Sequence, residues 1–284
     1  MFNIIKDLFK YDGRFRFSLI TLLCIVFFAL LSFWSPYDPS SSYYVPSNIP
    51  PGAKYLFGTN SRGQDIFWMM TFAIKNSLVF GIITALLSRI LAIFVGLISG
   101  YKGGIIDRVL MSINDSFIVL PLLPILILLK FIIGKMELST LALVMAVFGW
   151  SWDARLIRSQ VLSLRERDFT YTSVFSGMGT LKIALKEYFP FIIPIVLATT
   201  VNNMLWSLGM EMTLAILGLS AIHISTIGTT IYWANQHQAL ISGVWWWLAF
   251  PIIISIFLFL ALYLLSVSLS EYLDPRFRIQ QTRV

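Results

Sequence analysis

Residues 77–99 read SLVFGIITALLSRILAIFVGLIS, an apolar stretch in which Arg89 is the one charged residue. An apolar stretch longer than roughly 18 residues predicts a membrane-spanning helix. More such stretches lie on both sides of it, and of all 284 residues 57% are hydrophobic and 12% charged. An ordinary soluble domain has about 25% charged residues. The composition therefore excludes a soluble or disordered protein and predicts an all-α polytopic membrane protein.

Six apolar stretches are candidate membrane spans. They cover residues 17–34, 77–99, 109–133, 138–152, 191–217 and 244–269. Lys and Arg are enriched in cytoplasmic loops, so their distribution indicates orientation. With the N-terminus inside, fifteen of the 21 Lys and Arg lie on the inner side, and the outer loops hold only Lys54, Arg62, Lys75 and Lys135. We expect six transmembrane helices with both termini in the cytoplasm, and we read the net charge of +7 as a sign of orientation rather than of nucleic-acid binding.

The chain divides into three predicted parts. Residues 1–34 form a cytoplasmic N-terminus and a first helix, which we interpret as a permanent anchor rather than a signal peptide because no small-residue cleavage site follows it. Residues 35–76 form an extracytoplasmic loop and an interfacial amphipathic segment. Residues 77–284 form the main membrane domain, and a long cytoplasmic segment, 153–190, lies within it.

The cytoplasmic segment 153–190 is too long to be a simple connection. Its helical patterns are separated by Ser176-Gly177-Met178-Gly179, which predicts a helix, a turn and a second helix. Arginines alternate with apolar residues in the first part, so we expect the fourth span to continue below the membrane as an amphipathic helix. Such a helix presents a surface to a partner protein.

Charges inside membrane spans are costly and usually face the bundle interior or a polar path. Arg89 and Asp115 lie at about 18 and 15 Å from the same cytoplasmic turn, at 1.5 Å per residue. We therefore predict an ion pair between Arg89 and Asp115 on adjacent helices. The alternative is that each side chain has a separate partner.

The fifth span has a wide polar face, which is typical of a translocation path. The candidate path residues are Asn202, Asn203, Trp206, Ser207 and Glu211. An alternative is that small and polar residues only pack and hydrogen-bond neighbouring helices. Glu211 in particular could be structural.

Several motifs resemble those of the permease subunits of ATP-binding-cassette (ABC) importers of the dipeptide and oligopeptide type, in particular the C-type subunit. Residues 58–65, GTNSRGQD, resemble the family's GTD-x-x-GRD segment, from which Asn60 and Gln64 depart. The further matching segments are the glycine-rich turn at 96–104, the ARL-x-R-x-QVLSLRERDF stretch ending at Phe169, Gly218-Leu219-Ser220, and the terminal LDPR at 273–276.

The resemblance implies a coupling helix that docks on an ATPase subunit through the family's EAA loop. Here Gly177 occupies the loop's glycine position, but the triplet reads Tyr171-Thr172-Ser173, so the glutamate is missing. Asp168 is expected to cap the helix at its N-terminus and Gly177 to end it. The residues expected to contribute to coupling are Asp168, Phe169, Tyr171, Val174, Phe175, Ser176 and Gly177.

The resemblance further implies a type I importer fold in a prokaryotic inner membrane. The implied partners are a homologous second permease, two ATPase subunits and an extracytoplasmic solute-binding protein, besides membrane lipid. The ATPase subunits would bind ATP and Mg, with no cofactor in this chain. The solute would be peptide-like, and an oligosaccharide or nickel is the alternative.

Two competing function classes remain. The first is a stand-alone secondary transporter or channel that uses Arg89, Asp115 and Glu211 as an ion relay, and the second is a membrane enzyme. The chain has no GxxxxGK[ST] phosphate loop and no recognisable hydrolytic motif. His223 and His237 have no cysteine or carboxylate between them and do not predict a metal site. We expect a non-catalytic subunit whose energy comes from partners.

Overall fold

A computed structural model describes residues 8–134 and 136–273 of the chain, and the elements in this part are helices. The elements are α2 (Gly13–Leu30), η1 (Leu31–Trp34), α3 (Ile66–Lys102), α4 (Gly104–Val119), α5 (Leu122–Ile133), α6 (Leu138–Gly149), α7 (Ser151–Arg165), α8 (Asp168–Phe175), α9 (Thr180–Ile183), the π-helix η2 (Ala184–Tyr188), α10 (Phe189–Ile216), α11 (Ile227–Gln236) and α12 (Trp246–Leu273).

Some sequence predictions concern residues outside the described part. These residues are Lys6, Lys135, Arg276, Arg278 and Arg283 of the charge distribution, and residues 274–276 of the LDPR motif. The inside-to-outside charge difference therefore stays a prediction from the sequence.

Four helical segments are long and apolar enough to cross a membrane. They are Gly13–Trp34, Ile66–Lys102, Ala184–Ile216 and Trp246–Tyr272. Two further pairs qualify only as bent units, α4 with α5 at 82° and α6 with α7 at 40°. The described residues thus contain four spans, or up to six if each bent pair is one span, and the fold is that of an all-α polytopic membrane protein.

The expected straight span over residues 109–133 is interrupted near its middle. Leu120 has extended backbone with ψ 128°, and α5 begins after Pro121. Proline disfavours helical backbone in the residue before it and lacks an N–H for the helical hydrogen bond. This local effect produces the 82° bend between α4 and α5.

Helix α3 begins earlier than the sequence suggested. The predicted interfacial segment is in part the first turns of α3, which starts at Ile66 with the Asp65 carboxylate accepting a hydrogen bond from the Phe67 N–H at 2.9 Å. Ile66, Met70 and Ile74 are buried in protein rather than lying on the membrane surface. With 37 residues the helix is about 56 Å long, well beyond the roughly 30 Å of a hydrocarbon core.

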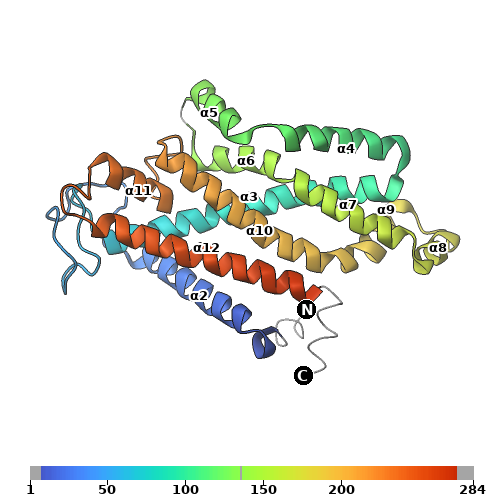
Figure 1. Cartoon of the computed structure of the whole chain (residues 1–284), viewed down its shortest axis with the longest axis horizontal. Coiled ribbons are helices and arrows are strands. Elements are labelled where there is room, and N and C mark those ends of the chain that lie inside the picture. The colour runs from blue at the N-terminus through green and yellow to red at the C-terminus, as the bar shows by residue number, and fades with distance from the viewer. Residues whose placement is uncertain (1–7, 135, 274–284) are drawn as a thin grey trace.

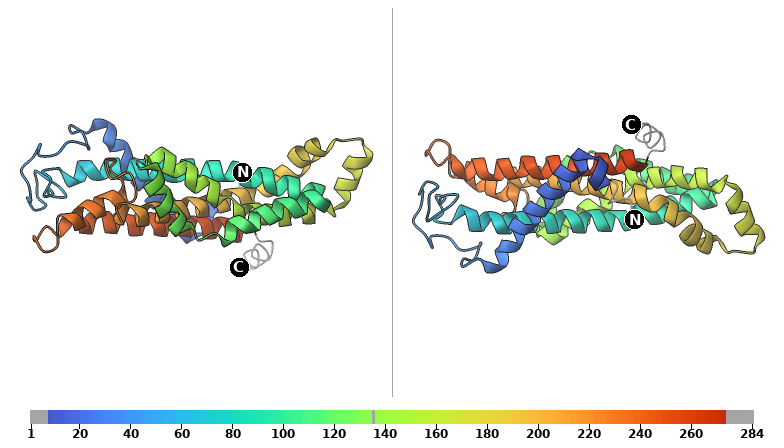
Figure 2. Two further views of the ribbon diagram at one scale, coloured as in Figure 1. Left: turned by 90° about the horizontal axis from the view of Figure 1, so that it is seen from above. Right: turned by 90° about the horizontal axis from the view of Figure 1, so that it is seen from below.

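The long helices run along the long axis of the molecule (Figure 1). Helix α2 packs on α12 and α3, α10 packs on α3 and α12, and α7 lies along α3. At one end α8 extends past the other helices, and at the opposite end lie α11 and the loop that precedes α3, as both views in Figure 2 also show.

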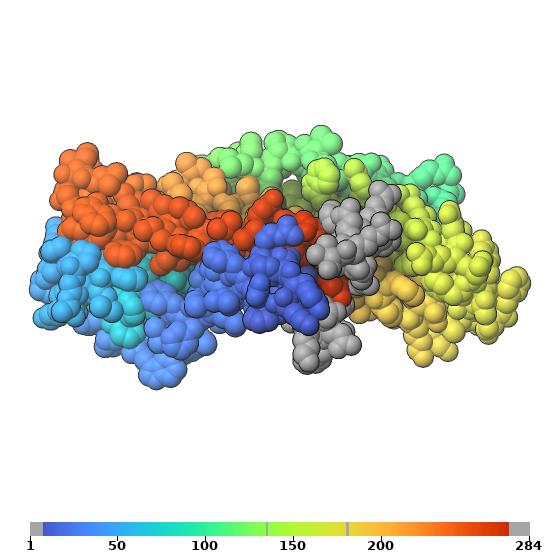
Figure 3. Space-filling model, turned by 60° about the horizontal axis from the view of Figure 1, so that its bottom comes forward, coloured from blue at the N-terminus to red at the C-terminus, as the bar shows by residue number. Residues whose placement is uncertain are grey.

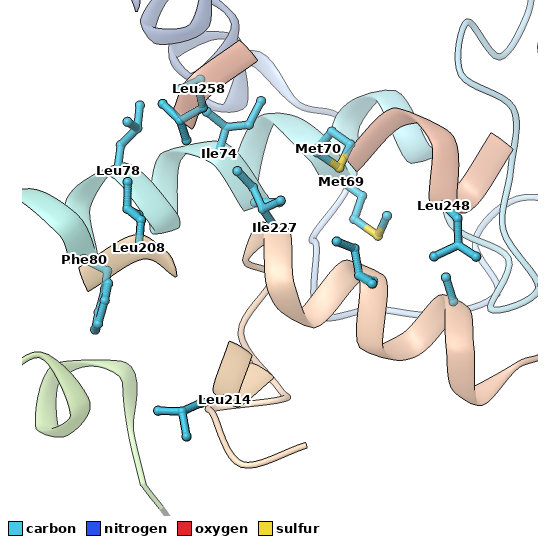
Figure 4. Close-up of a cluster of buried hydrophobic side chains, with 14 of the residues drawn as sticks. Met69, Met70, Ile74, Leu78, Phe80, Leu208, Leu214, Ile227, Leu248 and Leu258 are labelled. Carbon is cyan, nitrogen blue, oxygen red and sulfur yellow. The ribbon is translucent and has the colours of Figure 1, made fainter. Parts of the chain in front are cut away.

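Two buried apolar clusters hold the helices together. The first joins α3, α10, α11 and α12 through residues such as Met70, Leu208, Ile227 and Leu258 (Figure 4). The second joins α3, α7, η2 and α10 and includes Tyr188. Each cluster includes residues from a different part of α3, so this helix packs against both groups of helices.

Glycines allow α3 and α7 to approach closely. A Cβ added at Gly96 would lie 2.8 Å from the carbonyl oxygen of Ala154, and one added at Gly100 would lie 2.7 Å from Val161. Small residues four positions apart commonly permit this contact between membrane helices. The glycine-rich segment therefore makes a helix–helix contact, and the turn itself is formed by Gly103 and Gly104, which have positive φ.

Candidate functional site

The polar face of α10 borders a cavity of about 370 Å³. Asn202, Asn203 and Trp206, three of the five candidate path residues, line it. The rest of its wall comes from the break between α4 and α5 and from the junction of α6 with α7. These other lining residues are Phe117, Ile118, Leu120, Leu122, Phe148, Gly149, Ser151, Trp152, Asp153 and Met210. Amide and carboxylate groups thus face the same space as several aromatic rings.

A buried ion pair lies beside this cavity. The Arg89 Nη2 atom of α3 lies 2.9 Å from the Asp153 Oδ2 atom of α7, and the Arg89 side chain is only 5% exposed. Arg89 Nε also donates to the Thr200 hydroxyl of α10 at 2.8 Å. Removal of one partner from such a pair leaves an uncompensated buried charge. The pair therefore ties three helices together at the cavity wall.

Asn203 completes this polar cluster. Its Nδ2 atom donates to the Gly149 carbonyl at 2.8 Å and to Asp153 Oδ2 at 3.4 Å, and its Oδ1 atom accepts from the Ser88 hydroxyl at 3.2 Å. The cluster joins α3, α10 and the α6–α7 junction through one amide. Asn203 thus both borders the cavity and fixes the carboxylate of Asp153.

The predicted ion pair between Arg89 and Asp115 is wrong. Arg89 pairs with Asp153, and Asp115 of α4 pairs with Arg155 of α7, with both side chains of the latter pair about half exposed. Asp107 of α4 also pairs with α7, through Arg158. The reason is that α7 packs on both α3 and α4 and supplies the opposite charge to each.

Ser207 and Glu211 lie away from the cavity. The Ser207 hydroxyl donates to the Met204 carbonyl of its own helix at 2.9 Å. The buried Glu211 carboxylate accepts hydrogen bonds from the hydroxyls of Thr226 at 2.9 Å and Ser220 at 3.2 Å. Thr226 is the N-cap of α11, so Glu211 joins α10 to the loop that positions α11. This geometry corresponds to the structural alternative for Glu211.

Sequence reasoning missed Asp153. The sequence places it at the start of the cytoplasmic segment 153–190, directly after the apolar stretch that ends at Trp152. A carboxylate directly at such a boundary, with arginines only on its C-terminal side, was the available signal. It did not reveal the partner, because Arg89 lies 64 positions earlier in the chain.

Helix α8 is the candidate coupling site, and it lies at the far end of the molecule (Figure 1). Tyr171, Val174 and Phe175 are 56%, 50% and 88% exposed, so they form an apolar surface open to a partner. On the opposite side Thr170 is buried, where its hydroxyl donates to the Leu164 carbonyl at 2.9 Å and accepts from the Tyr188 hydroxyl at 3.2 Å. These bonds hold α8 to the end of α7 and to η2.

Phe169 belongs to the inner side of α8, although we expected it on the docking surface. Its ring stacks on Phe191 at a centroid distance of 5.5 Å and contacts Tyr188 edge-on at 6.3 Å. The rotation of α8 about its axis explains the difference, because positions 169 and 170 face the bundle while 171, 174 and 175 face away. Phe169 therefore positions the helix.

The predicted N-terminal cap of α8 differs from the one in the structure, whereas the predicted C-terminal glycine stop is present. The predicted cap Asp168 is the first helical residue instead, and the N-cap is Arg167 with extended backbone. The Asp168 carboxylate still lies in the first turn of α8, where the helix dipole favours a negative charge. At the other end Gly177 has φ +74°, and the Gly177 and Met178 N–H groups donate to the carbonyls of Val174 and Ser173. These bonds form the Schellman motif typical of a glycine stop.

Among the residues that the structure describes, no group of three or more His, Cys, Asp and Glu side chains could hold a metal ion. His223 Nε2 lies 3.1 Å from Glu137 Oε2, whereas the His237 ring is tilted against the Trp247 ring at a centroid distance of 5.6 Å. The two histidines thus have separate surroundings.

Comparison with known proteins identifies a family and several relatives of this chain. The family model described as "Binding-protein-dependent transport system inner membrane component" matches residues 92–279. A dipeptide transport system permease protein of Bacillus subtilis (strain 168) is 29% identical over 262 residues, which are 91% of this chain and 80% of the relative.

Two other relatives have comparable similarity. An oligopeptide transport system permease protein of Bacillus subtilis (strain 168) is 30% identical over 217 residues, covering 73% of this chain and 71% of the relative. A nickel transport system permease protein of Escherichia coli (strain K12) is 29% identical over 271 residues, covering 92% and 93%. The matches extend across both the cavity and the α8 region.

Proposed function

The chain belongs to the family of binding-protein-dependent transport system inner membrane components, and on this premise we propose that it forms half of a solute path driven by separate ATPase subunits. It is a multi-pass inner-membrane permease subunit of an ABC importer. The observation that carries the proposal is the exposed apolar surface of α8, at the end of a helix that leads to the cavity.

Helix α7 gives the proposed coupling a physical route. Asp153 in its first turn borders the cavity, and only two residues separate its last residue, Arg165, from α8. A rigid helix of 15 residues spans about 22 Å. Movement of α8 with a bound ATPase would therefore shift the Asp153 end of α7 against α3 and α10. Alternating access needs such a linkage between a docking site and the solute path.

The cavity would be one side of the path. We propose that a homologous second permease closes it, and that two ATPase subunits bind ATP and Mg and dock on the two α8 helices. A binding protein would deliver the solute at the opposite end, to residues 36–75 and 220–243. Asn202 offers an exposed amide that can pair with the polar backbone of a peptide-like solute, and Trp206 and Phe148 offer apolar contact.

Reconstitution tests this proposal. The purified permease pair, ATPase subunits and binding protein are placed in liposomes, and uptake of labelled peptides is measured with and without ATP. We expect ATP-dependent uptake that requires the binding protein and survives ionophores. Uptake by this chain alone that collapses with the ion gradient would instead establish a secondary transporter, and selective uptake of an oligosaccharide or nickel would replace the peptide-like solute.

A further inference from the structure

A second pocket, of about 270 Å³, lies at the end of the molecule opposite α8. Its walls come from two segments far apart in the sequence. Pro39, Ser40, Arg62, Gln64 and Met69 form one wall, and Ile222, His223, Ser225, Thr229, Thr230, Trp233 and Trp247 form the other. The space-filling view shows these parts of the chain, blue and orange, meeting at one end of the molecule (Figure 3).

The distinctive group in this pocket is an unpaired guanidinium. The Arg62 guanidinium lies over the Trp233 ring, 4.4 Å from its centroid, and its Nη2 atom donates to the Ser42 hydroxyl at 3.2 Å. Across residues 8–134 and 136–273, Arg62 forms no ion pair, and the pocket lining in that part includes no Asp or Glu. A half-buried cation without a carboxylate favours an anionic ligand.

Two other observations point to the same ligand chemistry. Burial lowers the pKa of Arg62, which is what a cation without a counter-ion experiences. Burial, and then the charge of Arg62, also lowers the pKa of His237, so the positive field of the pocket extends to its neighbours.

The size and place of the pocket favour a docking partner over a transported solute. Its lining shares no residue with that of the 370 Å³ cavity, so the two are separate sites. A volume of about 270 Å³ fits one side chain rather than a whole peptide. The pocket also lies between the two segments proposed to meet the binding protein.

We propose that this pocket receives an acidic side chain of the extracytoplasmic binding protein, whose carboxylate pairs with Arg62 on the Trp233 platform. The inference rests on the proposed function, because it needs the α11 end of the molecule to face the binding protein. Arg62 offers a planar donor pair that matches a carboxylate. Contact with the Trp233 ring restrains the guanidinium before the partner arrives, which reduces the entropy lost on docking.

The test uses the whole complex in lipid nanodiscs and the purified binding protein, with docking affinity measured by biolayer interferometry. We expect Arg62→Gln to weaken docking about tenfold or more. The matched control is Lys54→Gln, which removes one exposed positive charge from the same segment, and it should change affinity by less than about twofold. Arg62→Lys should be intermediate, since it keeps the charge and loses the planar pair.

A charge-reversal pair keeps the test decisive if Arg62→Gln assembles poorly. Acidic surface residues of the binding protein are changed to Lys one at a time, and one of these variants should dock weakly to the unchanged complex and regain affinity with Arg62→Glu. Unchanged affinity of Arg62→Gln, or the lack of any rescuing partner, would overturn the proposal.

A further experiment distinguishes a carboxylate of the binding protein from a carboxylate of the transported solute. Docking is compared for the binding protein without solute, with a peptide that has a free carboxylate, and with its amidated form. An Arg62→Gln defect seen only with the free carboxylate would assign the pocket to the solute and refute the docking proposal. If the unchanged complex recruits no binding protein at all, the proposed function fails before any variant is considered.

Discussion

Asn60 and Gln64 replace the aspartate and arginine of the motif that residues 58–65 resemble, and they contact each other in the structure. Asn60 Nδ2 donates to Gln64 Oε1 at 3.0 Å, and both side chains are buried. Asn60 Oδ1 also accepts from two backbone N–H groups, and Gln64 donates to the carbonyls of Pro39 and Ser41. An aspartate and an arginine could join the same two positions as an ion pair, with the arginine donating to the carboxylate.

This neutral pair predicts a compensating double substitution. Asn60→Asp or Gln64→Arg alone should destabilise the protein by about 3 kcal/mol, because each leaves one buried charge without a partner. The two together should recover most of the loss. Thermal unfolding of the four proteins in detergent forms a double-mutant cycle. Additive losses in the double variant would contradict the pairing.

Asp153 and Asp115 both pair with arginines, but replacing them should lower the stability of the protein by different amounts. Asp153→Asn should lower stability by about 3 kcal/mol, because it leaves Arg89 buried without its counter-charge. Asp115→Asn should cost less than about 1 kcal/mol, since its pair with Arg155 is about half exposed. Melting temperatures of the purified variants measure the difference. Equal losses would show that the buried pair does not stabilise the helix packing.

At the scale of the element, α8 has one face for its partner and one for its own fold. Phe175 is 88% exposed, whereas Phe169 stacks on Phe191. The helix is too short to be stable alone, so its inner contacts and its glycine stop define its position. The two phenylalanines therefore serve different purposes despite lying on the same helix.

This difference predicts two separable defects. Phe175→Asp should abolish co-purification of the ATPase while the melting temperature stays within about 2 °C, because an exposed substitution changes stability little. Phe169→Asp should lower stability by about 2 kcal/mol or more, because a charge replaces a packed ring. Pull-down and thermal unfolding of both variants provide the comparison. Normal ATPase recovery with Phe175→Asp would refute the assigned surface.

At the scale of the whole molecule, the proposed sites lie at opposite ends of the long axis. Helix α8 is at one end, and α11 with the loop that precedes α3 is at the other (Figure 1). Residues of α11 and of this loop line the Arg62 pocket, and residues at the α4–α5 break and the α6–α7 junction line the cavity. Helices longer than the membrane core connect the ends. An importer needs this order, because the ATPase and the binding protein work on opposite sides of the membrane.

The orientation itself can be tested with the single cysteine of the chain, Cys24, changed to Ser. In this background we introduce Lys54→Cys or Glu166→Cys, both at exposed positions on opposite ends. A membrane-impermeant thiol reagent should label the first variant in intact cells and the second only after permeabilisation. The reverse result would invert the predicted topology.

Local sequence determined much of this protein by itself. The length of the apolar stretches predicted membrane helices, because lipid requires every backbone group to be paired within a helix. Gly177 predicted the end of α8, since its left-handed backbone is costly for other residues. Asn202 and Trp206 share one face of a helix by their spacing, Asn203 belongs to the adjoining stripe, and all three line the cavity.

Tertiary structure decided which residues meet. Arg89 has Asp153 rather than Asp115 as its partner, Phe169 turns inward, and the Arg62 pocket joins segments more than 150 residues apart. Sequence periodicity determines which side chains share a face of one helix, but the rotation of that helix and the choice of its neighbour depend on packing across the whole bundle. These long-range contacts have no local signal in the sequence.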